Sequence, residues 1–149
     1  DGRHVLDETR RTRVRHLADC QAFQLAIESQ VSAVGHAVSI GPTRHAWFNA
    51  RVGPGMAPIH GGHSHSGPHW HACTGPVGAG HVAGVALSAC AGAGSADWYV
   101  SPWGVMTANP CLHQALRTEP GGPPLRLSCR VLAFDGPLDD GRITQALAA

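Results

Sequence analysis

The feature that most constrains this chain is the placement of its glycines and prolines. Residues 8–34, ETRRTRVRHLADCQAFQLAIESQVSAV, contain neither, so all 19 glycines and 11 prolines lie outside this segment. Within it, apolar residues recur near the helical period of about 3.6 residues, namely Val14, Leu17, Cys20, Leu25, Ile27 and Val31. We therefore expect one long N-terminal helix over 8–34, followed by short elements separated by turns.

Beyond Gly35 the pattern changes to short stretches with alternating or compact apolar residues, as in strands. The candidate strands are 36–41, 44–52, 69–75, 81–89, 97–105 and 125–134. The segment 53–68 has no periodicity and is expected to be a loop, residues 108–118 a short helix, and the end of the chain a tail.

This order of elements predicts an α+β fold, a small antiparallel sheet with the N-terminal helix and a Cys-bearing helix packed on it. The 149 residues suit a single domain, 1–149. Within it we expect a core over 35–118 and a C-terminal strand and tail over 125–149. Aromatic residues make up only 5% of the chain, so the four tryptophans are expected to anchor the core.

Several classes of protein are disfavoured by composition. No stretch approaches 18 consecutive apolar residues, so we expect no membrane span. The polar, charged start does not resemble a signal peptide. Five cysteines without tight spacing make a poor disulfide framework and favour a reducing compartment such as the cytoplasm.

The eleven basic residues are all arginines, and four of them cluster near the start of the expected helix. These are Arg10, Arg11, Arg13 and Arg15. One interpretation is a solvated helical turn. The other is a patch that contacts phosphates of RNA or of an anionic lipid. Arginines at a helix N-terminus oppose the helix dipole, which favours an anionic partner.

A candidate nucleophile lies in the segment TANPCLHQAL. Asn109 is a good helix N-cap and Pro110 suits the first helical position, which would place Cys111 in the first turn. Free backbone N–H groups and the helix dipole there would lower the pKa of a thiol. The alternative is that Cys111 is a small buried apolar residue.

Two histidines could serve such a cysteine. His69 and His81 are twelve residues apart and flank the turn GPVGAG. If residues 69–75 and 81–89 pair as strands, the two histidines are expected to lie side by side. A cysteine next to them would complete a papain-like arrangement, with His69 as base and His81 orienting it.

These residues resemble a known family. The pattern HW…TG…HVA is similar to the H-box of the lecithin retinol acyltransferase group and its NlpC-type relatives, and NPCLHQAL is similar to their NC motif. Picornaviral 2A proteins of the H-box/NC type, as in the kobuvirus group around Aichi virus, carry this pair of motifs.

The resemblance covers residues 69–111 and implies a permuted NlpC/papain-like fold with Cys111, His69 and His81 as the site. It further implies a viral protein of the host cell cytoplasm that supports RNA replication. Its partners would be host proteins and viral RNA, with self-association left open, and it would need no cofactor. An active thiol acyltransferase or hydrolase acting on lipid or amide substrates is the alternative.

A metal-binding protein is a further alternative. Five histidines and one cysteine lie within fourteen residues, at His60, His63, His65, His69, His71 and Cys73. Imidazole and thiolate groups suit zinc or copper, although the spacing fits no standard zinc finger, and a solvated loop is the competing interpretation. His45 and His60 also form a rival H-box pair, with a looser match around Trp47.

Overall fold

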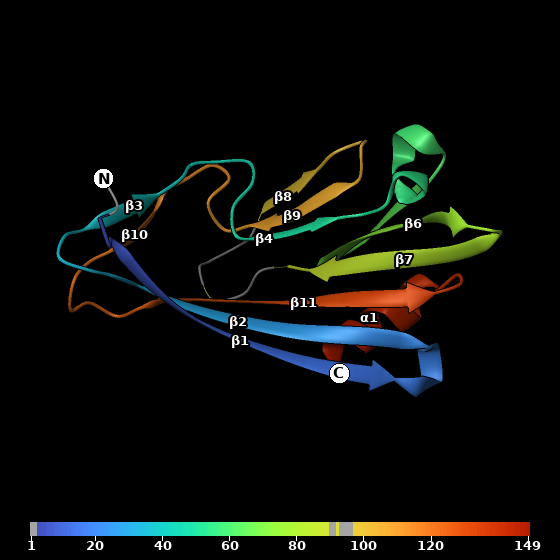
Figure 1. The fold of residues 1–149 in the computed structure, drawn as a ribbon, viewed down its shortest axis with the longest axis horizontal. Helices are drawn as coiled ribbons and strands as arrows, with labels where there is room; N and C mark the ends of the chain where they lie inside the picture. Colours follow the sequence, from blue (N-terminus) through green and yellow to red (C-terminus); the bar gives the residue numbers. More distant parts are fainter. Residues whose placement is uncertain (1–2, 90–91, 93–96) are drawn as a thin grey trace.

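The structure is a computed structural model that describes residues 3–89, 92 and 97–149. Its main feature is a six-stranded antiparallel sheet with the order β1-β2-β11-β7-β6-β5 (Figure 1). The strands are β1 (Leu6–Leu17), β2 (Ala22–Ala33), β5 (His63–Gly67), β6 (Trp70–Gly78), β7 (His81–Ser88) and β11 (Leu125–Asp135). Strands from both ends of the chain therefore lie next to each other.

A smaller antiparallel sheet covers part of one face of the large sheet, and a single helix lies on the other face (Figure 1). The small sheet contains β4 (Phe48–Arg51), β9 (Val105–Asn109) and β8 (Asp97–Val100), in that order. The helix is α1 (Asp140–Ala148). A separate pair, β3 (Val38–Ile40) and β10 (Leu116–Thr118), lies at one end of the molecule, and three short 3-10 turns are η1 (Ala18–Cys20), η2 (Pro54–Met56) and η3 (Pro58–His60).

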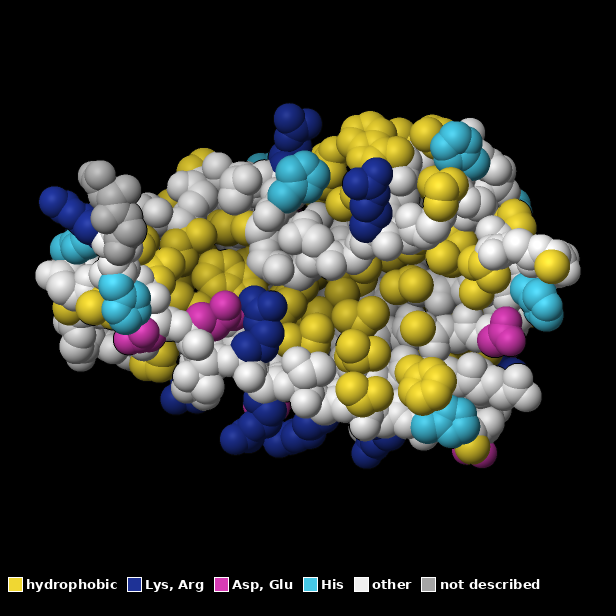
Figure 2. Space-filling view, viewed as in Figure 1, with side chains coloured by type: hydrophobic (Ala, Val, Ile, Leu, Met, Phe, Trp, Pro, Cys, Tyr) yellow, Lys and Arg dark blue, Asp and Glu magenta, His cyan; other side chains and the backbone are white. Residues whose placement is uncertain are grey.

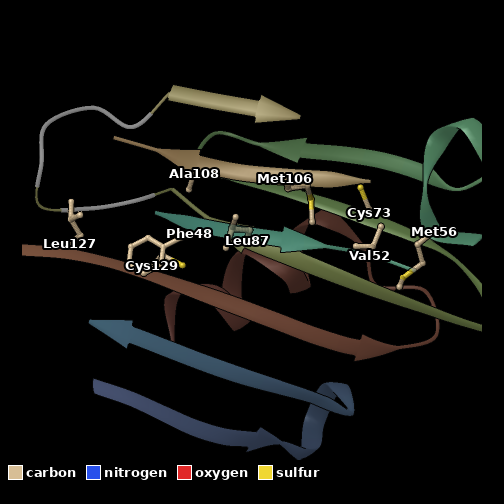
Figure 3. Close-up of a cluster of buried hydrophobic side chains, with 9 residues drawn as sticks. All are labelled: Phe48, Val52, Met56, Cys73, Leu87, Met106, Ala108, Leu127 and Cys129. Carbon is tan, nitrogen blue, oxygen red and sulfur yellow. The ribbon is translucent and has the colours of Figure 1, made fainter. Parts of the chain in front are cut away.

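Alternation along the strands separates two apolar clusters. On β6, β7 and β11 the odd-numbered residues, among them Cys73, Leu87 and Cys129, pack beneath the small sheet (Figure 3). Even-numbered residues such as Trp70 and Leu132 pack beneath α1. We call these two sides of the large sheet the small-sheet face and the helix face. Successive side chains of a strand point to opposite faces, so both faces of these central strands must be apolar.

The expected helix over 8–34 is wrong, because this segment forms the hairpin β1–β2. Twelve consecutive residue pairs join the two strands, from Leu6 opposite Ala33 to Leu17 opposite Ala22. The turn needs no glycine, because η1 is followed by Gln21 in the left-handed conformation (φ 47°). The apolar residues of β2 pair with β11, and this long-range pairing decides between helix and strand.

The Cys-bearing helix over 108–118 is also wrong, and with it the α+β assignment. β9 continues through Asn109, a turn follows, and β10 begins at Leu116. The Asn109 side chain accepts a hydrogen bond from the backbone N–H of Cys111 at 2.9 Å. The same contact that caps a helix therefore closes a local Asx turn here. The fold is β-rich, with α1 as the one α-helix of the described residues.

Several predicted strands are confirmed, as 69–75, 81–89 and 125–134 correspond to β6, β7 and β11. The expected loop 53–68 contains η2, η3 and the edge strand β5, and the expected tail contains α1. Asp139 caps α1 by accepting a hydrogen bond from the N–H of Arg142 at 2.8 Å. Ile143, Ala146 and Leu147 form its buried side. Within the described ranges, no helix has the length and hydropathy of a membrane span.

The four tryptophans do not all serve the core. Trp70 is 2% exposed, whereas Trp47 and Trp98 are half-buried and Trp103 is 48% exposed. Gly67 faces Trp70 across the β5–β6 pair, and a side chain at Gly67 would overlap the indole ring. Trp70 can therefore lie flat beside the edge strand only because residue 67 has no side chain.

Candidate functional site

His69 and His81 do not lie side by side. β6 and β7 pair so that Trp70 lies opposite Ser88, while His81 lies opposite Gly78 at the turn. The backbone carbonyl of His69 accepts from the N–H of Ala89 at 2.6 Å, at the other end of the hairpin. Seven to eight residues at about 3.3 Å each therefore separate the two histidines, roughly 25 Å. A twelve-residue spacing across a tight turn places histidines at opposite ends of the strands.

Cys111 is a buried residue of the end of the molecule near β3 and β10. It is 0% exposed and packs with Ala46 and Leu116. Its backbone carbonyl accepts a hydrogen bond from Thr43 at 3.1 Å. Burial raises the pKa of the Cys111 thiol, the opposite of what an activated nucleophile requires. Within the described part of the chain, no hydrogen bond joins Cys111 to His69 or His81.

The histidine-rich segment is split between the two faces of the large sheet. His63 and His65 of β5 lie on the helix face, opposite Thr74 and Ala72 of β6, whereas His71 lies on the small-sheet face. Over residues 3–89, 92 and 97–149, no three His, Cys, Asp or Glu side chains come close enough together to hold a metal ion. The alternation of strands therefore disperses ligands that are close in sequence.

His45 and His60, the other candidate pair, lie in different parts of the fold. His45 packs edge-on against Tyr99 of β8, with ring centroids 5.0 Å apart. His60 ends the 3-10 turn η3, and its backbone N–H donates to Ala57. Each histidine therefore has its own partner, and neither contact joins His45 to His60.

The four predicted RNA-contacting arginines lie on β1 and are divided by its alternation. Arg11, Arg13 and Arg15 share the helix face, because their partners on β2 are the even-numbered Glu28, Ala26 and Gln24. Arg10 lies on the small-sheet face. The three arginines of the row recur every second residue, about 6.6 Å apart. We call Arg11, Arg13 and Arg15 the arginine row.

The arginine row lies on an exposed edge. β1 is the outermost strand of the large sheet, and every residue from Asp7 to His16 is exposed. Arg13 lies 3.7 Å from Glu28, and both side chains are about half exposed or more. Arg15 donates to the backbone carbonyl of Ala149 at 2.9 Å. The row therefore remains largely accessible to an anionic partner.

The small-sheet face of the same edge combines exposed apolar side chains with polar and charged ones. Val14 of β1 is 66% exposed and Phe23 of β2 is 53% exposed. His16 lies against Phe23 with ring centroids 5.0 Å apart. Figure 2 shows hydrophobic side chains at the surface below the small sheet, in the part of the face crossed by the outer strands of Figure 1. β1 therefore carries the arginine row on one face, and Val14 together with the ion pair of Glu8 and Arg10 on the other.

The chain was compared with known protein families, with curated proteins and with solved structures. Residues 1–148 match the model of a family of unknown function, DUF6807. The chain belongs to this family. No curated protein and no solved structure matches this chain. The kinship with viral proteins of the H-box/NC type stays a prediction.

The DUF6807 chain also contains a polar network that the sequence did not reveal. Ser29 of β2 donates to Glu8 at 2.5 Å and accepts from the indole N–H of Trp47 at 3.2 Å. Arg10 donates to the same carboxylate at 2.7 and 3.0 Å. Trp47 has a positive φ of 88°, which is unusual for a bulky residue. No sequence spacing links Glu8, Ser29 and Trp47, because β-pairing and a loop bring them together.

Two opposing effects set the ionisation of Glu8. Burial alone would raise the pKa of its carboxyl group. The hydrogen bonds from Ser29 and Arg10 and the charge of Arg10 outweigh that effect, so the pKa lies below the usual value of 4.5. Glu8 is therefore held as a carboxylate, and the network fixes Arg10 on the small-sheet face of β1.

Proposed function

We propose that this protein is a protein-binding module that receives an extended acidic segment of a partner beside β1. The segment would extend the large sheet by one strand. The observation that carries the proposal is the combination, in β1, of an exposed strand edge with the arginine row. Peptide addition to a sheet edge supplies affinity through main-chain hydrogen bonds and specificity through alternate side chains.

The backbone of β1 supports this mode of binding. β1 is twelve residues long, and its hydrogen-bonded neighbour among the described strands is β2 alone. Its outer N–H and C=O groups therefore face solvent, and such an edge is a template for another strand. At the opposite edge β5 has only five residues and lies close to α1. β1 is thus the edge with room for a peptide.

Charge and alternation indicate which peptide would fit. Residues of an added strand that lie on the helix face would meet the arginine row, which favours Asp or Glu there. Residues on the small-sheet face would meet Val14, which favours an apolar side chain at that position, and the ion pair of Glu8 and Arg10 farther along the strand. The preferred sequence therefore has acidic residues at alternate positions and an apolar residue next to Val14.

The arginine row also argues against a second copy of this chain as the occupant. Antiparallel pairing of β1 with itself would bring arginines of both copies together, and like charges directly opposite each other destabilise a sheet. RNA is the predicted partner of these arginines, and proteins that bind its single-stranded form also use aromatic side chains on which the bases stack. The helix face of β1 carries no aromatic side chain.

A binding measurement with defined peptides tests the proposal. A fluorescent peptide of alternating Glu and Val should bind with a dissociation constant of order 10–100 μM at low salt and more weakly at high salt. The combined variant Arg11→Glu, Arg13→Glu, Arg15→Glu should weaken binding at least about tenfold. Arg51→Glu, at an exposed arginine of β4, is the matched control and should bind like the wild type.

Two further probes separate strand addition from charge attraction alone. Methylation of every second peptide nitrogen removes hydrogen-bond donors but keeps the charges, so it should abolish binding to β1. An oligouridylate of similar charge tests the RNA interpretation. Equal binding of the methylated peptide, or binding of the oligouridylate alone, would contradict the proposal.

A further inference from the structure

One cavity on the helix face is distinct from the edge of β1. It has a volume of about 550 Å³ and lies between the C-terminal end of α1 and strands β2, β11 and β7. This volume is within the range of pockets that bind small molecules. Its lining combines apolar groups, such as Leu147 and Ala89, with hydroxyl side chains and with the charged side chains of Arg13, Glu28 and Arg130.

A single row of residues across five strands forms much of the lining. Strand register places Arg13, Ala26, Arg130, Ser88 and Trp70 in line on the helix face. Arg13 and Arg130 therefore flank the small side chain of Ala26, with about 10 Å between the outer two strands. The methyl group of Ala26 leaves an open floor between two guanidinium groups.

The two arginines are not equivalent. Arg13 has a carboxylate neighbour, Glu28, at 3.7 Å. In the described ranges of the chain, Arg130 forms no ion pair with a carboxylate. It is half-buried, and one of its N–H groups donates to the carbonyl of Leu147 at 2.9 Å. The hydrogen bond fixes the guanidinium group against the end of α1 and leaves its other N–H donors for a ligand.

The hydroxyl groups around Arg130 keep this arrangement in place. Ser88 accepts a hydrogen bond from the backbone N–H of Arg130 at 2.8 Å. Thr144 accepts from the indole N–H of Trp70 at 2.9 Å. Both hydroxyl groups therefore have hydrogen-bond partners within the protein. The positive charge of Arg130, in contrast, has no carboxylate partner among the described residues.

We infer that this cavity is a binding site for a small organic carboxylate with an apolar body. One uncompensated guanidinium group matches one carboxylate in charge, and its remaining N–H donors match the planar carboxylate geometry. Leu147 and Ala89 would contact the apolar body of the ligand. A dianionic phosphate would need a second cation without a carboxylate neighbour, whereas Arg13 lies 3.7 Å from Glu28.

Phenylacetate is a suitable probe, with benzyl alcohol and phenyl phosphate as the neutral and dianionic comparisons. Titration into isotopically labelled protein should shift the amide signals of Ser128, Arg130 and Thr144 in a saturable way, with a dissociation constant of order 0.1–1 mM. Phenyl phosphate should bind more weakly, and benzyl alcohol at least about tenfold more weakly.

Three variants make the test specific. Arg130→Gln removes the charge and should weaken phenylacetate binding at least about tenfold, whereas Arg126→Gln changes an exposed arginine of the same strand and face and should have no effect. Ala26→Leu retains both flanking arginines but fills the floor, so it should abolish binding even if Arg130→Gln fails to fold. Absence of saturable binding, or equal binding of benzyl alcohol, would overturn the inference.

Discussion

Trp70 and Thr144 are joined by a 2.9 Å hydrogen bond in which the indole N–H of β6 donates to a hydroxyl of α1. The Thr144 hydroxyl in turn donates to the carbonyl of Asp140 at 2.8 Å. Trp70 is also part of the apolar cluster beneath α1. A single side chain therefore joins the helix to the sheet by both a polar contact and buried apolar area.

Replacement of Trp70 by Phe should lower the free energy of unfolding by about 2 kcal/mol, since it removes the donor and part of the buried ring. Urea denaturation followed by circular dichroism measures the change. Trp103→Phe is the control, because Trp103 is 48% exposed and its replacement should cost less than about 0.5 kcal/mol. Equal losses in the two variants would contradict this role of Trp70.

His71 should make stability depend on pH. Its ring packs edge-on against Trp98, with centroids 4.6 Å apart, and its Nδ1 is buried without a hydrogen-bond partner. Burial lowers the pKa of His71 below the usual 6.5. Below about pH 6.5 the unfolded chain therefore binds a proton that the folded chain rejects, and stability falls as pH falls toward the pKa of the folded state.

Urea denaturation between pH 7.5 and pH 5 tests this dependence. His71→Phe keeps a ring against Trp98 and should reduce the loss of stability on acidification. His60→Gln changes an exposed histidine and should retain the wild-type dependence. The expectation fails if His71→Phe and the wild type lose stability in parallel.

The thiols should react in the order of their burial. Cys20 is half-buried, whereas Cys73, Cys111 and Cys129 are buried. Cys90 lies outside the described residues, so the measurement uses a Cys90→Ser background. A disulfide reagent should label Cys20 in the native protein and the other three thiols only after unfolding. Rapid labelling of Cys111 would instead indicate an activated nucleophile.

Burial of two thiols should also weaken the protein in alkali. Burial raises the pKa of both Cys73 and Cys111 above 9.0, although a hydrogen bond from Ser64 partly opposes the shift at Cys73. Above about pH 9 the unfolded chain loses protons that the folded chain retains, so stability falls as pH rises. Cys111→Ala should reduce this loss in urea denaturation at pH 8 and pH 10, and Cys20→Ala should leave it unchanged.

Ser29 should contribute more to stability than its size suggests. Ser29→Ala removes the hydroxyl that joins Trp47 to Glu8, and it leaves the indole N–H of the half-buried Trp47 and the Glu8 carboxylate each short of a partner. We expect a loss of about 1–2 kcal/mol, measured by thermal and urea denaturation. Ser39→Ala, at an exposed position of β3, should be close to neutral. A neutral Ser29→Ala would show that water replaces the hydroxyl.

Only part of the candidate surface could be foreseen. The arginines of β1 stood out because four of them lie within six residues, but their division between two faces depends on strand alternation. The cavity could not be predicted at all, since Arg13 and Arg130 are 117 positions apart in the chain and meet through register. The prediction of a catalytic site at Cys111 assumed a helix start, but the preceding Asn109 and Pro110 suit an Asx turn equally well.

Strong alternation in the sequence was enough to predict a strand such as Leu125–Asp135, because successive residues of a strand place their side chains on opposite faces. The cluster of arginines near the start was also visible in the sequence. By contrast, residues 6–33 form a hairpin rather than a helix because of their pairing with β11. The separation of His69 from His81 follows from the register of β6 and β7. In both cases the deciding interactions are hydrogen bonds and packing between strands distant in sequence, which local periodicity cannot encode.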